Sequence, residues 1–452
     1  MKRLLSVFLL TALLLTGCNT ADVATNSEAT ASSGAVAPPA TGNPPATTLP
    51  PVTTVPPVTT VPPATTVPPV TAVPPATTKP PVTTKPPATT VPPVTTNPPA
   101  TKPLADPVQV YLSSMTLKQK VGQLFAVAPE QLLSKYSAVT KVTDALKDGL
   151  TKYPVGGIIL FSENVISPDQ LSVLNRELKA ASGIPLFLGV DEEGGRVARL
   201  ANNSAFDLPK YESAASVGAS GNPEDARLMG KTIGAYLKDY GFNLDFAPVA
   251  DVNTNPNNPV IGNRAFSSDP VIAAKMAAAF SEGMEEAGII STFKHFPGHG
   301  DTAEDSHSGL AVNHKDRQTL ESCEWLPFLK AGSNDMVMVG HIALPEVTGG
   351  MTPATLSYEM VTEILKKDLG FSGLVITDSM QMGAITDSYN SGEAAVAALK
   401  AGCDIILMPN DLPSAFNAVV DAVNNGILSV QWLDSTVTRI LKFKQTHGIL
   451  TF

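Results

Sequence analysis

Fourteen consecutive residues of this chain, 294–307, hold a high density of side chains that can exchange protons. The stretch contains three of the six histidines, three carboxylates and a lysine. Pro297, Gly298 and Gly300 disfavour a regular helix through its first half. The apolar run that precedes it, 288–293, is typical of a buried strand. The stretch is therefore predicted to be a loop that presents ionisable groups where a strand ends, a common arrangement in α/β folds.

Metal binding is the first chemistry that these groups suggest. His295, His299, Asp301 and His307 are possible zinc ligands. A Pro-Gly pair separates the first two histidines, so they cannot share one helical face as the histidines of a His-Glu-X-X-His site do. A metal site stays open as an alternative. The sequence holds no Gly-X-Ser-X-Gly motif for a serine nucleophile and no glycine-rich phosphate loop.

Displacement at the anomeric carbon of a sugar fits the groups better. That reaction needs a carboxylate nucleophile and a proton donor for the departing oxygen. Asp378 follows the apolar run 374–377, which would hold its carboxylate rigidly. Histidine titrates near neutral pH, so His307 suits proton transfer in both directions, and Asp305 can orient its ring and favour its protonated form. Taken alone, Asp305-Ser306-His307 is better explained as the start of a helix that carries an incidental histidine.

Alternating apolar and amphipathic segments predict the elements that must position these groups. Short apolar runs bounded by turn residues predict eight strands: 122–127, 156–161, 186–190, 244–249, 289–293, 336–340, 374–377 and 404–408. Helical spacing lies between them, for example at 168–181, 223–240, 270–287, 317–331, 357–369 and 392–401. Apolar strands separated by helices indicate an α/β fold with a parallel sheet, and eight such units suggest a (β/α)8 TIM-type barrel. A doubly wound open sheet is the alternative.

Charged or imidazole side chains follow five consecutive predicted strands. They are Asp191, Asp251, Lys294 with His295, His341 and Asp378. The carboxyl ends of the strands of a barrel meet at one face, so these side chains are expected to surround one pocket. Some of the charges nearby are expected only to pair with one another, and Arg196 with Glu193 is one such pair.

These motifs together resemble the signature of the family 3 glycoside hydrolases, and in particular their β-N-acetylglucosaminidase branch. The run from Lys294 to Thr302, followed by Asp305-Ser306-His307, carries the resemblance most specifically. Three further segments match the family: 191–199, 246–252 with 260–266, and 377–380. The resemblance covers residues 104 to about 450 and implies a single-domain member of the family.

The resemblance also implies a role for each matching residue. Asp378 would be the nucleophile, His307 the acid/base and Asp305 its partner. Five further residues would hold the hydroxyl and acetamido groups of the non-reducing-end sugar: Asp191, Arg199, Arg264, Lys294 and His295. Glu192 stands where the family commonly has glutamine and Ala311 where it usually has proline, and both are expected to affect loop shape rather than catalysis. No metal and no cofactor are implied.

The first 18 residues are predicted to be a lipoprotein signal peptide. Two basic residues precede an apolar run that is too short to span a bilayer. The run ends in Leu-Thr-Gly-Cys, which resembles a lipobox and implies cleavage before Cys18 and attachment of lipid to its sulfur. An ordinary cleaved signal is the alternative. The mature protein is therefore expected outside the cytoplasm, anchored by lipid to the bacterial cell envelope.

A disordered linker is predicted between the signal and the catalytic barrel. Residues 19–103 have little to bury, and from Pro44 onward they repeat a Pro-Pro-(Val/Ala)-Thr-Thr-X hexapeptide. Paired prolines at this density remove the amide donors that a sheet or a helix would need. The linker is expected to act as a semi-rigid tether. The remaining residues, 104–452, are long enough for one large barrel domain.

Composition limits the partners of the protein. The formal net charge is -10, which argues against nucleic acid or an anionic membrane surface as the main partner. Only Cys323 and Cys403 remain after Cys18, so a disulfide framework does not stabilise the fold. We expect a monomer that binds a carbohydrate substrate and touches the membrane only through its lipid.

The expected activity is that of a retaining exo-β-N-acetylglucosaminidase. It would act through a covalent glycosyl-aspartate on terminal β-linked N-acetylglucosamine, such as that of peptidoglycan or muropeptide fragments. A phosphorylase is one alternative, because a histidine acid/base repels an incoming phosphate less than a carboxylate does. A non-catalytic cell-wall glycan-binding lipoprotein is another, although it would have no need of Asp378, Asp305 and His307 together.

Overall fold

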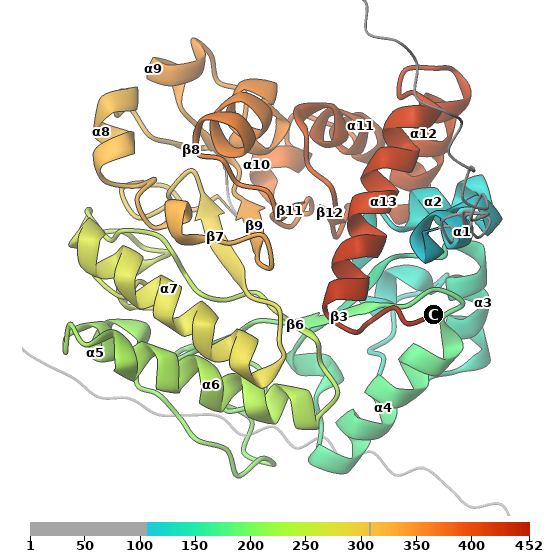
Figure 1. The fold of residues 1–452 in the computed structure, drawn as a ribbon, viewed down its shortest axis with the longest axis horizontal. Coiled ribbons are helices and arrows are strands. Elements are labelled where there is room, and N and C mark those ends of the chain that lie inside the picture. The colour runs from blue at the N-terminus through green and yellow to red at the C-terminus, as the bar shows by residue number, and fades with distance from the viewer. Residues whose placement is uncertain (1–105, 307–308) are drawn as a thin grey trace, which may run out of the picture. The chain divides into compact units, whose positions relative to one another are not determined.

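Short parallel strands form the inner layer of the protein, and helices lie outside them (Figure 1). The structure is a computed structural model that describes residues 106–306 and 309–452. The strands of the inner layer, in chain order, are β1 (Phe125–Val127), β2 (Gly157–Leu160), β3 (Phe187–Val190), β6 (Leu244–Asp245), β7 (Thr292–Phe296), β9 (Met336–Val339), β11 (Leu374–Thr377) and β12 (Ile406–Leu407).

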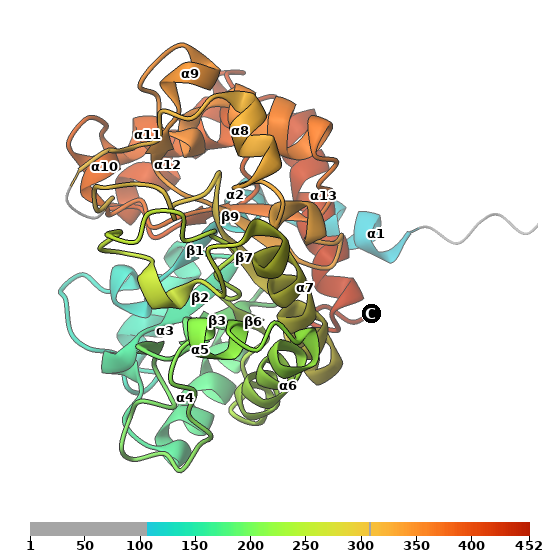
Figure 2. The same cartoon turned by 90° about the vertical axis from the view of Figure 1, so that its left-hand side faces the viewer.

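The strands pair in parallel and follow the order of the chain. One sheet has the order β12-β1-β2-β3-β6 and another the order β11-β9-β7. Isolated parallel bridges connect the two sheets at both junctions, between Leu244 and Ile290 on one side and between Ile376 and Ile405 on the other. The predicted α/β class with a parallel sheet is confirmed, and the sheet is curled and barrel-like (Figure 2).

The larger helices cover the outside of the sheet, and several begin and end where the sequence predicts. The main ones are α3 (Asp144–Lys152), α4 (Pro168–Ala181), α6 (Pro223–Asp239), α7 (Pro270–Ala287), α11 (Ser391–Ala401), α12 (Leu412–Asn424), α13 (Val430–Thr446) and the π-helix η6 (Glu359–Asp368). In α7 the Asp269 carboxylate accepts the amides of Val271 and Ile272, Pro270 opens the first turn, and Gly288 ends the helix with a φ of 76°. These are the residues that commonly begin and end helices.

Shorter elements lie at the two ends of the sheet and between the larger helices. The short helices are α1 (Pro107–Ser114), α2 (Leu117–Gly122), α5 (Ala214–Gly218), α8 (Arg317–Ser322), α9 (Pro345–Thr348) and α10 (Gly383–Thr386), with 3-10 turns η1 (Pro129–Leu132), η2 (Ser162–Asn164), η3 (Gly262–Arg264), η4 (Phe328–Lys330) and η5 (Ala354–Leu356). The remaining strands form two small pairs, β4 (Glu192–Gly194) with β5 (Val197–Ala198) and β8 (Ala311–Val312) with β10 (Ile342–Ala343).

Some predicted elements differ in extent from the structure, and two of them have a clear local cause. The helix expected over 317–331 is divided into α8 and η4, because the chain leaves the helical region at Cys323 and the Pro327 that follows has no amide hydrogen to continue it. The strand expected from 122 begins only at Phe125, because Gly122 is the last residue of α2. A Cβ on Gly122 would collide with the carbonyl of Pro154.

A buried lysine connects the last helix to the start of the sheet. Lys444 of α13 is fully buried, and its ammonium donates to the Gln123 side chain at 2.7 Å and to the carbonyls of Gly156 and Pro185 at 2.8 and 2.6 Å. It also lies 4.5 Å from the centre of the Phe187 ring. Burial lowers the pKa of Lys444 well below its usual range. One side chain therefore links α13 to the segments that lead into β1, β2 and β3.

The expected signal peptide, Cys18 and the linker 19–103 lie outside the described residues. Within 106–306 and 309–452, no helix has both the length and the apolar character that crossing a membrane requires.

Candidate active site

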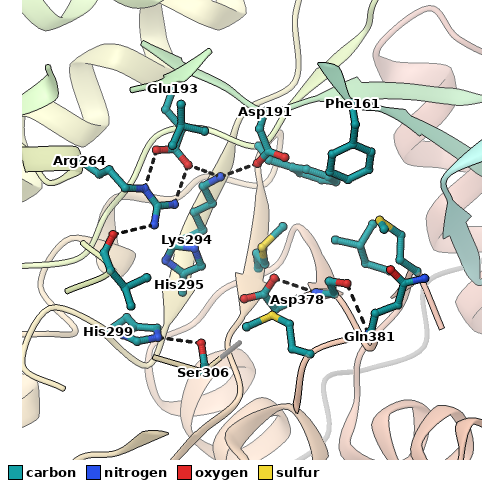
Figure 3. A pocket seen from close by; sticks show the side chains of 18 of the residues that line it. Phe161, Asp191, Glu193, Arg264, Lys294, His295, His299, Ser306, Asp378 and Gln381 are labelled. Carbon is teal, nitrogen blue, oxygen red and sulfur yellow. Dashed lines mark hydrogen bonds and ion pairs between the residues drawn. The ribbon is translucent and has the colours of Figure 1, made fainter. Parts of the chain in front are cut away.

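A cavity of about 410 Å³ opens where the parallel strands end. Its lining includes residues that lie in or directly after strands, namely Asp191 after β3, Lys294 and His295 in β7, Asp378 after β11 and Met408 after β12. Figure 3 shows Asp191, Lys294, His295 and Asp378 around one space. Of the five strand ends predicted to surround one pocket, three do so, with Asp191, Lys294 and His295, and Asp378, whereas Asp251 and His341 are not among the residues that line it.

One wall of the cavity is a buried network of opposite charges. Lys294, only 2% exposed, places its ammonium 2.8 Å from Asp191 and 2.6 Å from Glu193. Arg264 holds the same Glu193 with two parallel hydrogen bonds of 2.8 and 2.7 Å (Figure 3). Arg199 lies further out, 3.6 Å from Asp191, with its guanidinium 5.8 Å from the centre of the Phe161 ring. The network presents fixed donors and acceptors to the cavity.

The charges of this network hold one another in their ionised forms. Burial alone would raise the pKa of Glu193, but Lys294 and Arg264 outweigh it and the pKa lies below its usual range. Burial alone would lower the pKa of Lys294 and of Arg264, and in both cases the neighbouring carboxylates raise the pKa above its ordinary value. Glu193, Lys294 and Arg264 are therefore ionised at neutral pH.

A second buried carboxylate fixes the histidines of β7 and of the loop after it. Asp251 is fully buried and accepts the backbone amides of His295 and His299, at 3.2 and 2.6 Å, and lies 2.7 Å from the His295 ring. Burial raises the pKa of Asp251, but these partners outweigh it and the pKa is lowered overall. The His295 ring is thereby held in the cavity wall.

Asp378 lies at the centre of the cavity in Figure 3, across from the charged network. Its amide donates to the Val339 carbonyl at 2.9 Å, and its carboxylate accepts the Ser379 amide at 2.7 Å. Burial raises the pKa of the carboxyl group, but His295, His341 and the Ser379 amide more than offset this, so the pKa is below its ordinary value. A partly exposed, ionised carboxylate therefore faces the space that a ligand would occupy.

The loop after β7 brings its next residues to the same cavity. Ser306 lines the cavity and its hydroxyl lies 2.9 Å from the His299 ring, whose other nitrogen is 2.6 Å from the Thr302 hydroxyl. Asp305 is partly exposed beside it. His307, the expected acid/base, lies outside the described residues. The loop thus reaches the cavity at the residue immediately before His307.

The possible metal ligands have other partners. Asp251 contacts His295, Ser306 contacts His299, and Asp301 lies 3.0 Å from the ammonium of Lys315. Within 106–306 and 309–452, no three histidine, cysteine, aspartate or glutamate side chains are grouped closely enough to share a metal ion.

The structure corrects one pair and adds two site residues. Glu193 pairs with Lys294 and Arg264, whereas Arg196 donates to the backbone carbonyls of Val260 and Ile261, so the expected Arg196–Glu193 pair is wrong. Glu193 lines the cavity, as does Phe161, which follows β2. Glu193 stands in the segment 191–199 that carried the resemblance, but its partners, Lys294 of β7 and Arg264 of η3, are distant in sequence.

Comparisons with known proteins agree on one family. A model of the Glycosyl hydrolase family 3 N terminal domain matches residues 116–443. Beta-hexosaminidase A of Pseudoalteromonas piscicida is 36% identical over 335 residues, which cover 68% of this chain and 56% of that protein. The Beta-hexosaminidase of Idiomarina loihiensis is 37% identical over 291 residues, covering 63% of this chain and 85% of the relative.

A solved structure gives the same match in three dimensions. It is a glycoside hydrolase family 3 beta-N-acetylglucosaminidase from Paenibacillus sp. str. FPU-7, with a TM-score of 0.69 and 36% sequence identity. The match covers 75% of this chain and 65% of the solved one. The chain therefore spans less than two thirds of that protein and of the Pseudoalteromonas relative.

Proposed function

Because this chain belongs to glycosyl hydrolase family 3, we propose that it is a retaining exo-β-N-acetylglucosaminidase. It removes terminal, non-reducing β-linked N-acetylglucosamine, and peptidoglycan or muropeptide fragments are the substrates we propose. One observation carries the proposal: the ionised Asp378 carboxylate faces a cavity whose opposite wall is the network of Lys294, Asp191, Glu193 and Arg264. Relatives named beta-hexosaminidase or beta-N-acetylglucosaminidase support the choice of sugar.

In the proposed reaction Asp378 is the nucleophile and His307 the acid/base. A carboxylate oxygen of Asp378 bonds to C1 as the bond from C1 to the leaving oxygen breaks, and His307 gives its proton to that oxygen. Water then attacks C1 of the glycosyl-aspartate, His307 takes the proton of the water, and Asp378 leaves as a carboxylate. Asp305 orients the His307 ring and favours its protonated form.

The charged wall suits the binding of a sugar ring. Asp191 can accept hydrogen bonds from hydroxyl groups, while Lys294, Arg264, Arg199 and His295 can donate to hydroxyl or acetamido oxygens. Their mutual contacts hold these side chains in place before a sugar arrives, which lowers the entropy cost of orienting it.

The curled sheet and the beginning of the chain add two further proposals. The bridges at both junctions of the sheet support a closed (β/α)8 barrel. The run of residues that ends at Cys18 supports a lipid-anchored protein outside the cytoplasm, with the linker 19–103 as its tether. A barrel displayed in this way would reach glycans of the cell envelope.

Trapping the intermediate tests the proposed function. A slow 5-fluoro analogue of N-acetylglucosamine should label the enzyme, and peptide mass mapping should place the label on Asp378. Asp378→Ala should abolish turnover of 4-nitrophenyl N-acetylglucosaminide, whereas Asp387→Asn, at an exposed aspartate nearby, should not. A label on another residue, or no turnover of any β-hexosaminide, would overturn the proposal.

The product formed in the presence of phosphate completes this test. Hydrolysis yields free N-acetylglucosamine whether or not phosphate is present. Accumulation of the sugar 1-phosphate would instead identify a phosphorylase.

A further inference from the structure

A second cavity of about 400 Å³ adjoins the proposed active site. The two cavities share the side chains of Phe161, Gln381 and Met408 in their walls. Figure 3 places Phe161 and Gln381 on the side of the first cavity that lies away from Arg264 and Glu193. A ligand in the first cavity could therefore extend past these shared residues into the second.

The second cavity is built at the same end of the sheet as the first. Its remaining lining residues come from the segment after β1, namely Ala128, Glu130, Gln131 and Tyr136, and from Glu163, which follows β2. The shared Gln381 and Met408 follow β11 and β12. The cavity thus belongs to the face of the sheet where the proposed chemistry takes place.

Tyr136 presents an aromatic surface beside this cavity. Tyr136 is 73% exposed, which is high for an aromatic residue. Its hydroxyl lies 2.7 and 2.8 Å from the two carboxylate oxygens of Glu163, to which it donates. The hydroxyl is thereby fixed at one edge while the ring remains accessible, so the ring can serve as a flat contact surface for a ligand.

The charge of the second cavity differs from that of the first. Among the described residues that line it, the ionisable ones besides Tyr136 are the two carboxylates Glu130 and Glu163. Glu130 is 6% exposed, and one of its oxygens accepts the Val139 amide and the Asn164 side chain, each at 2.7 Å. With no lysine or arginine in this lining, a carboxylate on a ligand would meet like charge without a counter-ion.

We propose that the second cavity binds the sugar attached to the one that is cleaved, and that this second sugar is uncharged. Tyr136 supplies its stacking surface, and the two carboxylates disfavour a second sugar that carries a free acid. The proposal rests on the proposed function, because only an enzyme that cleaves a glycosidic bond has a leaving group to place there. It selects neutral second units, which include a muramic acid whose lactyl carboxyl is amide-linked to peptide as in muropeptides, over second units with a free carboxylate.

Substrates with and without a second sugar test the stacking role of Tyr136. The full-length protein is used. The kcat/KM is measured for N-acetyl-β-glucosaminyl fluoride, which has no second sugar, and for N,N′-diacetylchitobiose, whose second sugar is neutral. We expect Tyr136→Ala to lower the ratio of the chitobiose value to the fluoride value about three- to tenfold. Tyr358→Ala removes another exposed tyrosine, which lines a different cavity, and should leave the ratio unchanged.

A disaccharide with a free carboxylate on its second sugar tests the charge preference. The β-1,4-linked N-acetylglucosaminyl-N-acetylmuramic acid carries such a group on its lactyl ether. The wild-type enzyme should cleave it less efficiently than chitobiose. Glu163→Gln keeps an acceptor for the Tyr136 hydroxyl and removes the charge. It should therefore narrow the difference in kcat/KM between chitobiose and the acidic disaccharide.

The outcomes separate this proposal from the proposed function. Turnover of the fluoride with a ratio that Tyr136→Ala does not change would overturn the second-cavity proposal and leave the activity standing. A wild-type preference for the acidic disaccharide would overturn the charge preference. Turnover of none of the three substrates would overturn both.

Discussion

At the scale of single residues, the site depends on charges that stabilise one another. Lys294 contacts Asp191 and Glu193, and Glu193 in turn holds Arg264. A buried charge costs free energy unless it is paired and hydrogen-bonded, so removal of one member exposes the others to that cost. The same side chains are the ones proposed to hold the substrate. Stability and substrate binding are therefore coupled at these positions.

Replacement of Glu193 by glutamine tests that coupling. Lys294 and Arg264 lose a shared counter-ion, so Glu193→Gln should lower the free energy of unfolding at pH 7 by about 3 kcal/mol or more and raise KM. Because the folded-state pKa of Glu193 lies below its ordinary value of 4.5, its contribution is complete above pH 4.5 and is lost as the pH falls through the folded pKa.

Denaturant unfolding of both proteins at several pH values measures this difference. The gap between wild type and variant should be constant near neutral pH and narrow only below pH 4.5. Glu212→Gln, at an exposed glutamate, should change the free energy of unfolding little. A gap that narrowed already between pH 8 and pH 6 would contradict this account.

The pH dependence of kcat/KM tests the proposed partnership of Asp305 with His307. The pKa of Asp378 is below its ordinary value of 3.8, so the nucleophile stays ionised until the pH falls below that value. Loss of activity at high pH should instead follow deprotonation of His307. Asp305→Asn removes a charge that favours the protonated ring, so the basic limb should move to lower pH by about one unit or more. Glu304→Gln, one residue earlier and exposed, should leave the limb in place.

At the scale of elements, the loop after β7 is anchored by residues that do not line the cavity. Lys315 places its ammonium 3.0 Å from Asp301 and 2.5 Å from Glu324, and the Thr254 hydroxyl donates to Asp301 at 2.9 Å. Glu324 is fully buried. This cluster fixes the loop a few residues before the segment that contains Asp305.

Loss of the Lys315 anchor should slow the reaction through the position of the loop. Lys315→Met leaves Glu324 buried beside an apolar side chain and takes the ammonium away from Asp301, so we expect a lower melting temperature and a fall in kcat of about tenfold. Lys315→Arg keeps the charge and should recover most of both. Lys330→Met, at an exposed lysine, is the matched control. An unchanged kcat in a destabilised Lys315→Met protein would contradict a role of this anchor in catalysis.

The sequence predicts elements best where their ends are marked by specific residues. The predicted bounds of α4 and α7 agree with the structure because a side-chain cap and a proline begin each helix. The strand expected over 244–249 is shorter, since β6 covers only Leu244–Asp245 and Pro248 has no amide hydrogen for a sheet. The alternation of apolar runs and helical segments predicted the parallel direction and the order of the strands, but not their lengths.

The candidate site could be predicted where it depends on strand ends and not where it depends on loop packing. Asp191, Lys294 and Asp378 lie in or beside strands, so their convergence follows from a curled parallel sheet. The partner of Glu193 comes from the turn that contains Arg264, and the sequence favoured the nearer Arg196. Tyr136 carries no signal in sequence, because its role depends on which loops lie side by side.

At the scale of the whole molecule, the chain divides into a long N-terminal segment and a domain. Contacts separate residues 1–95 from residues 96–452 as two units. The site residues described above all belong to the second unit. The first unit contains the proposed lipid attachment site, so anchoring and catalysis should be separable.

Replacement of the proposed lipidated cysteine tests this separation. Cys18→Ser should move the protein from the membrane fraction to the soluble fraction of cells, because the acyl chains that hold it can no longer be attached. Turnover of a soluble aryl glycoside per molecule should stay the same. Cys323→Ser is the control and should remain with the membranes. A wild-type protein found only in the soluble fraction would contradict the anchor.

The buried contacts of Lys444 can form only late in the synthesis of the chain. Its amine reaches groups near residues 123, 156 and 185, which emerge from the ribosome long before α13 does. The contacts of Lys444 therefore cannot form until α13, the last helix, has been synthesised. For the proposed export of the chain across a membrane, this order means that the early segments would pass without the contacts that Lys444 makes in the folded domain.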